Sequence, residues 1–349
     1  MDNKASMMQK LKAFPVTNFF ITNIGMIIAL ILLSVFFGVL SPSFFSANNV
    51  SNILRQISIN AIIAFGMTGV LLIGGIDLSV GSMLALTGCT AVLVINAGGP
   101  VVVAVLAALG IGLLGGFLNG LIITKIGLPP FIVTLAMMSI CRGAAYLYSD
   151  GKPSPFDNDT FSLIGTGYVF DVIPIPVVIM VAILIVMSIL LNKTRFGRNI
   201  YAMGGNRECA RFSGIKIGNT EIAVYSISGV LAAVSGLILT TRLNSGQPMV
   251  GEGYEMDAIA AAVLGGTSFS GGIGYVGGTM IGALVLGVLS NGMNMLEISY
   301  YWQQVVKGII ILIAVYIDAM KKTKRTTVKR MPRESDGSQT EQEKTEVKA

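Results

Sequence analysis

Long apolar segments separated by short polar ones occupy almost the whole chain. A helix needs about 20 apolar residues to cross about 30 Å of hydrocarbon, because each residue rises about 1.5 Å. Segments of about this length, or somewhat shorter, are 19–40, 56–75, 79–97, 101–124, 129–149, 173–191, 221–241, 256–269, 275–293 and 300–319. The pattern predicts an all-α polytopic membrane protein with about ten transmembrane helices.

Two of these segments need comment. The first, 19–40, is too long for the core of a signal peptide and no small-residue cleavage site closes it, so we expect it to be the first membrane helix. The segment 256–269 is short for a full crossing. We expect it to be tilted, broken or partly re-entrant, which is tolerated only where protein or water covers the backbone.

Composition supports a membrane protein. The chain is 53% hydrophobic and 12% charged, whereas soluble domains carry about 25% charged residues. It contains no histidine, which removes histidine acid–base catalysis and disfavours a zinc site. Cys89, Cys141 and Cys209 have neither metal-binding spacing nor a disulfide pattern, so we predict that all three are structural.

The distribution of lysine and arginine predicts the orientation. The N-terminal tail, Lys125, the loop 192–219 and the tail from Lys321 are basic, whereas 150–171 is acidic. Since basic loops remain in the cytoplasm, both termini and 192–219 are predicted to be cytoplasmic, which requires an even number of spans.

The predicted organisation is therefore a cytoplasmic tail (1–18), a transmembrane domain (19–320) containing the cytoplasmic loop 192–219, and a cytoplasmic disordered tail (321–349). We expect no nucleic-acid binding, because the basic run in the last tail lacks interleaved aromatic residues.

The loop 192–219 is too long for a simple turn. Its segment 192–216 holds six lysines and arginines against a single acid, Glu208. Two interpretations remain open for these basic residues: they anchor the topology, or they contact a partner on the cytoplasmic side.

Two glycine-rich segments interrupt the apolar runs: GGIDLSVG (74–81) and GYEMDAIAAAVLGGTSFSGG (253–272). A lipid-facing carboxylate is costly, so Asp77 is expected at an interface or inside a cavity lined by protein. The first segment is either a helix-capping turn or a hinge or pathway element. The second is either a capped short helix with a flexible exit, whose two acids favour the positive helix end, or a short helix near the translocation axis. The pathway or hinge candidates are Gly74, Gly75, Asp77, Ser79, Gly81, Asp257, Gly265 and Gly266.

Further patterns bear on function. Glycine stripes at 112, 116 and 120 and at 274, 278 and 282 predict close helix packing. A weak internal repeat is suggested by residues 60–64 against 257–261, and by Asn119-Gly120 against Asn291-Gly292. There is no Walker A sequence, so any ATP that drives this protein is bound by another chain.

The chain resembles the permease subunits of bacterial ABC sugar importers, in the ribose, galactose, xylose and arabinose branch, over roughly residues 19–320. The resemblance rests on the two glycine-rich segments, on TRFGRNIYAMGGNRECARFSGI (194–215) and on NGMNMLEISYYWQQVVKG (291–308). It is greatest to the ribose permeases. Glu297 is unusual for this branch; it is either solvated or contacts a partner.

The resemblance implies a multi-pass protein of the bacterial cytoplasmic membrane that is not itself an enzyme. A separate cytoplasmic ATPase would hydrolyse ATP and hold ATP and magnesium, an extracytoplasmic binding protein would deliver the sugar, and a second permease copy would complete a homodimer. No cofactor is expected in this chain.

The resemblance also implies a short coupling helix within 199–214. Gly204 and Gly205 would form a turn, and Asn206 would cap a helix spanning 207–213. The residues implicated in ATPase coupling are Arg195, Gly197, Arg198, Gly204, Gly205, Asn206, Arg207, Arg211 and Gly214. Alternatives are an ion-coupled secondary sugar transporter, an intramembrane enzyme, and an ABC permease for nucleosides or a quorum-signal sugar derivative.

Overall fold

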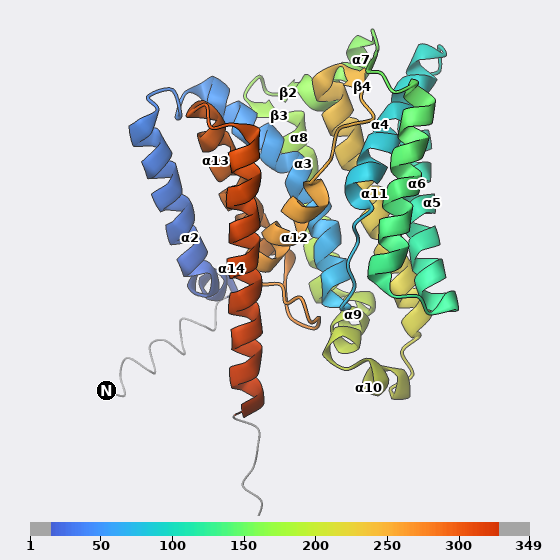
Figure 1. Cartoon of the computed structure of the whole chain (residues 1–349), viewed down its shortest axis with the longest axis vertical. Coiled ribbons are helices and arrows are strands. Elements are labelled where there is room, and N and C mark those ends of the chain that lie inside the picture. Colours follow the sequence, from blue (N-terminus) through green and yellow to red (C-terminus); the bar gives the residue numbers. More distant parts are fainter. Residues whose placement is uncertain (1–14, 328–349) are drawn as a thin grey trace, which may run out of the picture.

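The computed structural model describes residues 15–327, which form a bundle of helices (Figure 1). The helices are α2 (Pro15–Leu40), α3 (Ala47–Leu72), α4 (Val80–Asn96), α5 (Val101–Ile126), α6 (Pro130–Ser149), α7 (Asp159–Thr166), α8 (Ile175–Lys193), α9 (Arg195–Gly205), α10 (Arg207–Phe212), α11 (Ile217–Leu243), α12 (Tyr254–Leu264), α13 (Val276–Met295) and α14 (Tyr300–Thr327). Short antiparallel pairs join β1 (Ser154–Pro155) to β4 (Ser245–Gly246) and β2 (Tyr168–Val169) to β3 (Ile173–Pro174).

The predicted apolar segments coincide with helices. Within the described residues, seven helices are long and apolar enough to cross a membrane: α2, α3, α5, α6, α8, α11 and α13. α4 is apolar but shorter. α14 continues to Thr327, so helix extends past the predicted end of the transmembrane domain at 320. Residues 1–14 and 328–349, which make up most of the two predicted tails, lie outside the described residues.

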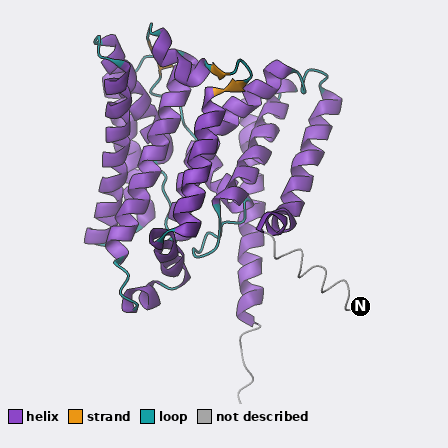
Figure 2. Ribbon diagram, turned by 180° about the vertical axis from the view of Figure 1, so that it is seen from behind, coloured by secondary structure: helices purple, strands orange, loops and turns teal. Residues whose placement is uncertain are grey.

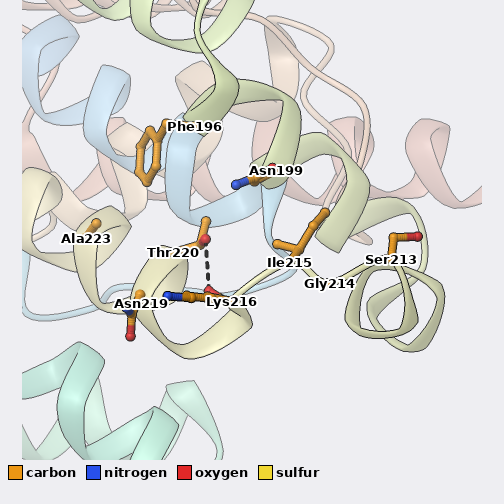
Figure 3. Close-up of a pocket in the computed structure, with 9 residues that line it drawn as sticks. All are labelled: Phe196, Asn199, Ser213, Gly214, Ile215, Lys216, Asn219, Thr220 and Ala223. Atoms are coloured by element: carbon orange, nitrogen blue, oxygen red, sulfur yellow. Dashed lines mark hydrogen bonds between the residues drawn. The ribbon is translucent and has the colours of Figure 1, made fainter.

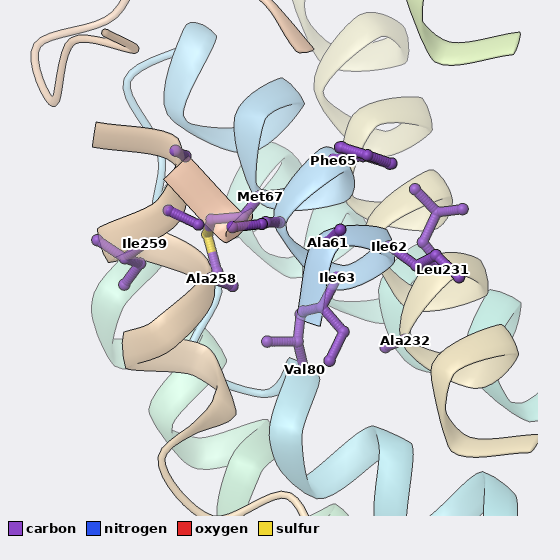
Figure 4. Close-up of a cluster of buried hydrophobic side chains, with 14 of the residues drawn as sticks. Ala61, Ile62, Ile63, Phe65, Met67, Val80, Leu231, Ala232, Ala258 and Ile259 are labelled. Carbon is purple, nitrogen blue, oxygen red and sulfur yellow. The ribbon is translucent and has the colours of Figure 1, made fainter. Parts of the chain in front are cut away.

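Three helices form the centre of the bundle. In the most apolar 18-residue stretch of each helix, most residues are buried in α3 (78%), α11 (67%) and α13 (83%), whereas at most 28% are buried in α2, α5, α6 and α8. Figure 4 shows side chains of α3 between those of α11 and α12, including Phe65, Met67, Leu231 and Ile259. A helix that is apolar on all sides must be buried or face lipid. The inner helices are buried, and the outer helices face lipid.

Two non-helical segments interrupt the bundle. Residues 73–79 separate α3 from α4, and residues 244–253, which contain β4 and then continue mostly as turns, separate α11 from α12. Because of these segments, α4 and α12 begin partway through the bundle (Figure 1). The start of α4 touches the turns that lead into α12: an added Cβ at Gly81 would lie 2.2 Å from the carbonyl oxygen of Gly251. The short, broken crossing predicted at 256–269 is thus α12, which ends at Leu264.

Part of the suggested repeat has a structural counterpart. A long helix, a non-helical break, a shorter helix and a long helix follow one another in α3–α4–α5 and again in α11–α12–α13. Asn119 and Asn291 lie in the matching last helices, α5 and α13. The other suggested pair was wrong, because 60–64 lie in α3 whereas 257–261 lie in α12.

Glycines permit the closest helix contacts. Added Cβ atoms at Gly112 and Gly116 would lie 2.4 and 2.2 Å from backbone oxygens of α11. Gly278 and Gly282 would meet oxygens of Gly265 and Ala261 at 2.0 Å. Both stripes therefore pack helices, as predicted. Gly274 is an exception, since it precedes α13 with φ 150°.

The two ends of the bundle carry different elements. α9, α10, the start of α2 and the end of α14 lie at one end, and α7 with the β2–β3 pair lies at the other (Figures 1 and 2). The basic loop 192–219 and the acidic segment 150–171 are thus on opposite ends, which agrees with the charge-based prediction.

Candidate functional site

The basic loop folds into two short helices, α9 and α10. The Thr194 hydroxyl accepts a hydrogen bond from the Gly197 amide (3.1 Å) at the start of α9. Asn206 ends α9 and caps α10, its side-chain oxygen accepting from the Cys209 amide at 2.9 Å. The predicted capped helix from 207 is confirmed as α10. The predicted turn at Gly204 and Gly205 was wrong, because α9 continues through both glycines and the chain turns at Asn206.

α10 also has a well-formed C-terminal end. Gly214 adopts φ 81°, and its amide donates to the carbonyl of Arg211 at 3.0 Å. The next amide, of Ile215, donates to the carbonyl of Ala210 at 3.2 Å. This pair of bonds is the Schellman arrangement, which favours glycine at the left-handed position. Both ends of α10 therefore have hydrogen-bond partners within the chain.

The three glycines of α9 have different surroundings. Added Cβ atoms would lie 1.9 Å from the Leu191 carbonyl oxygen at Gly197, and 1.8 Å from the Leu72 carbonyl oxygen at Gly204. At Gly205, an added Cβ would meet no described atom within 4 Å. Gly197 and Gly204 are thus required for packing within this chain, whereas Gly205 faces open space.

α9 packs against two parts of the bundle that are distant in sequence. Gly204 lies against the end of α3, whose Leu72 carbonyl also accepts from the Gly272 amide at 2.9 Å. The Tyr201 hydroxyl donates to the carbonyl of Gly274 at 2.8 Å. α9 therefore contacts both the start of the 73–79 break and the loop that follows α12.

The arginines of the loop divide into two groups. Arg195, Arg198 and Arg211 are exposed. Arg207 instead donates to both oxygens of Glu221 on α11, at 3.1 and 2.7 Å. Glu221 is buried, Arg207 is half exposed, and the hydrogen bonds that Arg207 donates to Glu221 raise the pKa of Arg207. This pair fastens α10 to α11. The guanidinium of Arg207 is therefore engaged within the chain and is not a free surface group.

Sequence reasoning missed Phe212. Its side chain is 86% exposed at the end of α10, beside exposed Arg211 and Cys209. An aromatic side chain on a polar surface favours a protein contact. Its exposure depends on the orientation of a single short helix, which hydrophobic periodicity does not give.

A cavity of about 480 Å³ opens between α9 and α11. Figure 3 shows Phe196 and Asn199 of α9 on one side and Asn219 and Thr220 of α11 on the other, with Ile215 and Lys216 in the link. The Thr220 hydroxyl donates to the carbonyl of Lys216 at 3.1 Å. The mixed apolar and polar lining is suited to receive a protruding side chain from a protein docked on α9 and α10.

The candidate Asp77 is buried in a hydrogen-bond network. Its Oδ1 accepts from the Ser79 amide (3.0 Å) and hydroxyl (2.6 Å), and its Oδ2 accepts from the Ser228 hydroxyl of α11 at 2.9 Å. Asn119 of α5 donates to the Ser79 hydroxyl, also at 2.9 Å. Ser79 is the N-cap residue of α4, but its side chain makes no capping bond. Asp77 thus fastens the 73–79 break to α5 and α11.

The candidate glycines of the two segments lie at close contacts or turns. An added Cβ would lie 2.4 Å from the Tyr225 hydroxyl at Gly75 and 2.4 Å from the carbonyl carbon of Gly278 at Gly265. Gly74 and Gly266 have φ 78° and 86°. These positions require glycine for local geometry.

The candidate Asp257 belongs to a different group. Its Oδ2 accepts from the Lys307 ammonium of α14 at 2.8 Å, and both side chains are largely buried. Glu255 and Asp257 lie in the first turn of α12, where acids favour the positive helix end. The structure therefore does not join Asp77 and Asp257 in one site: the first holds the 73–79 break, and the second ties α12 to α14.

Two further features concern possible metal ligands and the cysteines. No group of three or more His, Cys, Asp or Glu side chains within residues 15–327 is placed to hold a metal ion. Cys89 and Cys141 are buried, whereas Cys209 is exposed on α10. The prediction that all three are structural therefore fits the first two better than the third.

The cap of α10 gives a direct prediction. Asn206→Ala should destabilise α10 by about 1 kcal/mol, because the Cys209 amide loses its acceptor. A loss of about 1 kcal/mol should accelerate hydrogen exchange of the α10 amides roughly fivefold. Asn219→Ala is the matched control, since Asn219 lies inside α11 and caps no helix. Equal exchange in both variants would contradict the capping role.

Comparison with known proteins gives consistent matches. The family model described as "Branched-chain amino acid transport system / permease component" matches residues 49–315. The ribose import permease protein RbsC of Bacillus subtilis (strain 168) is 48% identical over 300 residues, which cover 85% of this chain and 93% of the relative. The L-arabinose transport system permease protein AraH of Escherichia coli (strain K12) is 41% identical over 304 residues, covering 87% and 92%.

A more distant relative extends the set. The xylose transport system permease protein XylH of Haemophilus influenzae (strain ATCC 51907 / DSM 11121 / KW20 / Rd) is 35% identical over an alignment 361 positions long. The alignment covers 86% of this chain and 96% of the relative. No solved structure matches the chain.

Proposed function

The chain belongs to the branched-chain amino acid transport system / permease component family, and from this premise we propose that it is the membrane-spanning subunit of an ATP-driven importer for ribose or a related sugar. The similarity to the ribose import permeases supports ribose as the first cargo to test, with arabinose and xylose next. The protein lies in the cytoplasmic membrane of a bacterium and carries no catalytic site.

In the proposed topology the chain crosses the membrane about ten times. Seven crossings are the long apolar helices, and α14 supplies another. α4 and α12 supply the remaining two, each completed by the non-helical segment that precedes it. Such backbone is tolerated at membrane depth only where protein or water covers it, and the burial of Asp77, Leu78 and Ser79 meets that condition for the first segment. Both termini and the α9–α10 end face the cytoplasm.

The observation that carries the proposal is the way α9 and α10 pack against the bundle. These helices are capped at their ends, held by the Arg207–Glu221 pair, and placed against the segments that adjoin both broken crossings. Exposed arginines and Phe212 leave a surface for a partner. A cytoplasmic ATPase docked there could push on α9 and thereby move the 73–79 break and the loop after α12 together.

Other partners follow from the same proposal. ATP and magnesium are held by the ATPase. A sugar-binding protein docks at the opposite end, near α7 and the β2–β3 pair. A second copy of the permease completes the transport path.

The surface arginines give a prediction. Arg211→Glu should leave the permease folded but lower sugar uptake at least about tenfold, because reversing an interface charge costs on the order of 2 kcal/mol or more. The matched control is Lys125→Glu, which makes the same charge change at an exposed position outside α9 and α10. Uptake in vesicles and the ATP consumed per sugar are the measurements. Equal losses in both variants would indicate topology anchoring instead of docking.

The cargo is tested by competition. Vesicles holding the permease, its ATPase and its binding protein are supplied with labelled ribose and an excess of unlabelled ribose, arabinose, xylose or a nucleoside. Ribose should compete best. Stronger competition by a nucleoside would replace the proposed cargo.

A further inference from the structure

A second cavity, of about 570 Å³, lies between α4, α6 and the chain that leads into α12. Six polar side chains on its wall matter here: Ser82, Ser139, Arg142, Tyr146, Glu252 and Glu255. None of them was a sequence-level candidate for the pathway. Binding pockets for small molecules measure about 300–1,000 Å³, so the cavity has the size of such a pocket.

The cavity lies at membrane depth. Arg142 is well inside α6, one of the seven candidate spans. Ser82 is in the first turn of α4 and Glu255 in the first turn of α12, and both helices begin partway through the bundle. Charged side chains at this depth are costly toward lipid and occur where water or protein surrounds them. The face of α6 that carries Arg142 must therefore be turned away from lipid.

The sequence of α6 separates two faces. Ser139, Arg142 and Tyr146 recur at helical spacing on the cavity side. Ile140 and Leu147 occupy the next positions along the chain and are 63% and 84% exposed, and Ser139 and Tyr146 are exposed as well. The difference is chemical: a polar strip of the helix suits water and the neighbouring apolar strip suits lipid.

Arg142 also fixes the cavity wall. Its guanidinium donates to the carbonyl of Val250 at 2.8 Å and to the carbonyl of Pro248. These bonds hold the turns of residues 247–253 against α6, so that Glu252, which is exposed, and Glu255 border the same space. The wall is therefore a preformed set of charged and hydroxyl groups.

We propose that this cavity is a water-filled part of the transport path and a weak binding site for a polyhydroxy compound of the size of an aldopentose. The assignment rests on the proposed function, since it presumes a sugar cargo. Carboxylate oxygens of Glu252 and Glu255 accept hydrogen bonds from sugar hydroxyls, Ser82 and Ser139 donate or accept, and the Tyr146 ring covers apolar C–H groups.

Cysteine labelling in the assembled complex tests the assignment. Exposed Cys209 is replaced by serine, and single cysteines are placed at Ser139, Tyr146, Ile140 or Leu147. A charged, membrane-impermeant thiol reagent should label Ser139→Cys and Tyr146→Cys roughly a hundredfold faster than Ile140→Cys and Leu147→Cys, because lipid excludes charge. Equal, slow labelling at all four positions would overturn the water-filled cavity.

Transport by the same variants tests the cargo site. Ribose uptake is measured before and after labelling, so that each variant is its own reference. A bulky adduct at position 139 or 146 should reduce uptake at least about tenfold, since it fills the pocket. Unchanged uptake with complete labelling would overturn the cargo site. Absence of ribose uptake before labelling in the parent complex would instead overturn the proposed function, and with it the cargo assigned to the cavity.

Discussion

Replacing Gly204 by alanine is expected to abolish ATP-driven uptake. The added Cβ would lie 1.8 Å from the Leu72 carbonyl oxygen and 2.3 Å from the Gly272 amide nitrogen. Both neighbours are backbone atoms, and the two are already hydrogen-bonded to each other at 2.9 Å. Neither can move without displacing α3 or the 265–275 loop. Overpacking of this kind costs about 3 kcal/mol, so α9 should lose its seat.

Gly205→Ala is the matched control for this prediction. The same methyl group, one residue further on, meets no described atom within 4 Å. Two measurements separate the variants: thermal unfolding in detergent and uptake in vesicles. Gly204→Ala alone should show a lower unfolding midpoint and lost uptake. Normal uptake by Gly204→Ala would contradict the role assigned to α9. Normal stability with lost uptake in Gly205→Ala would place position 205 at the ATPase surface.

Replacing Asp77 by alanine is expected to lower the free energy of unfolding by about 3 kcal/mol. The side chain is 1% exposed and accepts three hydrogen bonds, from the Ser79 amide and hydroxyl and from the Ser228 hydroxyl. Alanine would leave these buried donors without their acceptor, which costs about 1–3 kcal/mol for each group left unpaired. The 73–79 break would then lose its attachment to α11.

Asp77→Asn distinguishes the network from a requirement for charge. Asparagine keeps an oxygen for the two Ser79 donors, and its amide nitrogen can donate to the Ser228 hydroxyl, which also accepts. The unfolding midpoint of Asp77→Asn should therefore stay near that of the parent, while that of Asp77→Ala falls. If both variants retain uptake and stability, the break is held by packing alone. If both lose uptake but only alanine loses stability, the carboxylate has a further part in transport.

The sequence predicted the helices well because membrane crossings leave a strong signal. Long apolar runs located α5 at 101–126 and α13 at 276–295 to within a few residues. The resemblance to the sugar permeases implied a cap at Asn206, which the structure confirms. The weak segment at 256–269 was recognised as incomplete, and it is the short helix α12.

The contacts that define the candidate site could not be read in the same way. Arg207 resembles the other arginines of its loop, yet only the fold places it beside Glu221. Gly204 and Gly205 are identical neighbours, but one touches backbone and the other does not. Arg142 lies inside an apolar run, where its charge was outweighed by its neighbours. In each case the deciding partner is distant in sequence, and helical periodicity carries no information about it.

The central claim is that this chain carries a sugar inward only when an ATPase drives it through α9 and α10. It is tested most directly by uptake of labelled ribose into vesicles that hold the permease and its binding protein, with and without the ATPase and ATP. The account predicts uptake when all components are present, no uptake when the ATPase is omitted, and no loss when ion gradients are dissipated. Uptake that persists without the ATPase and stops when the gradient collapses would contradict the account and indicate a secondary transporter.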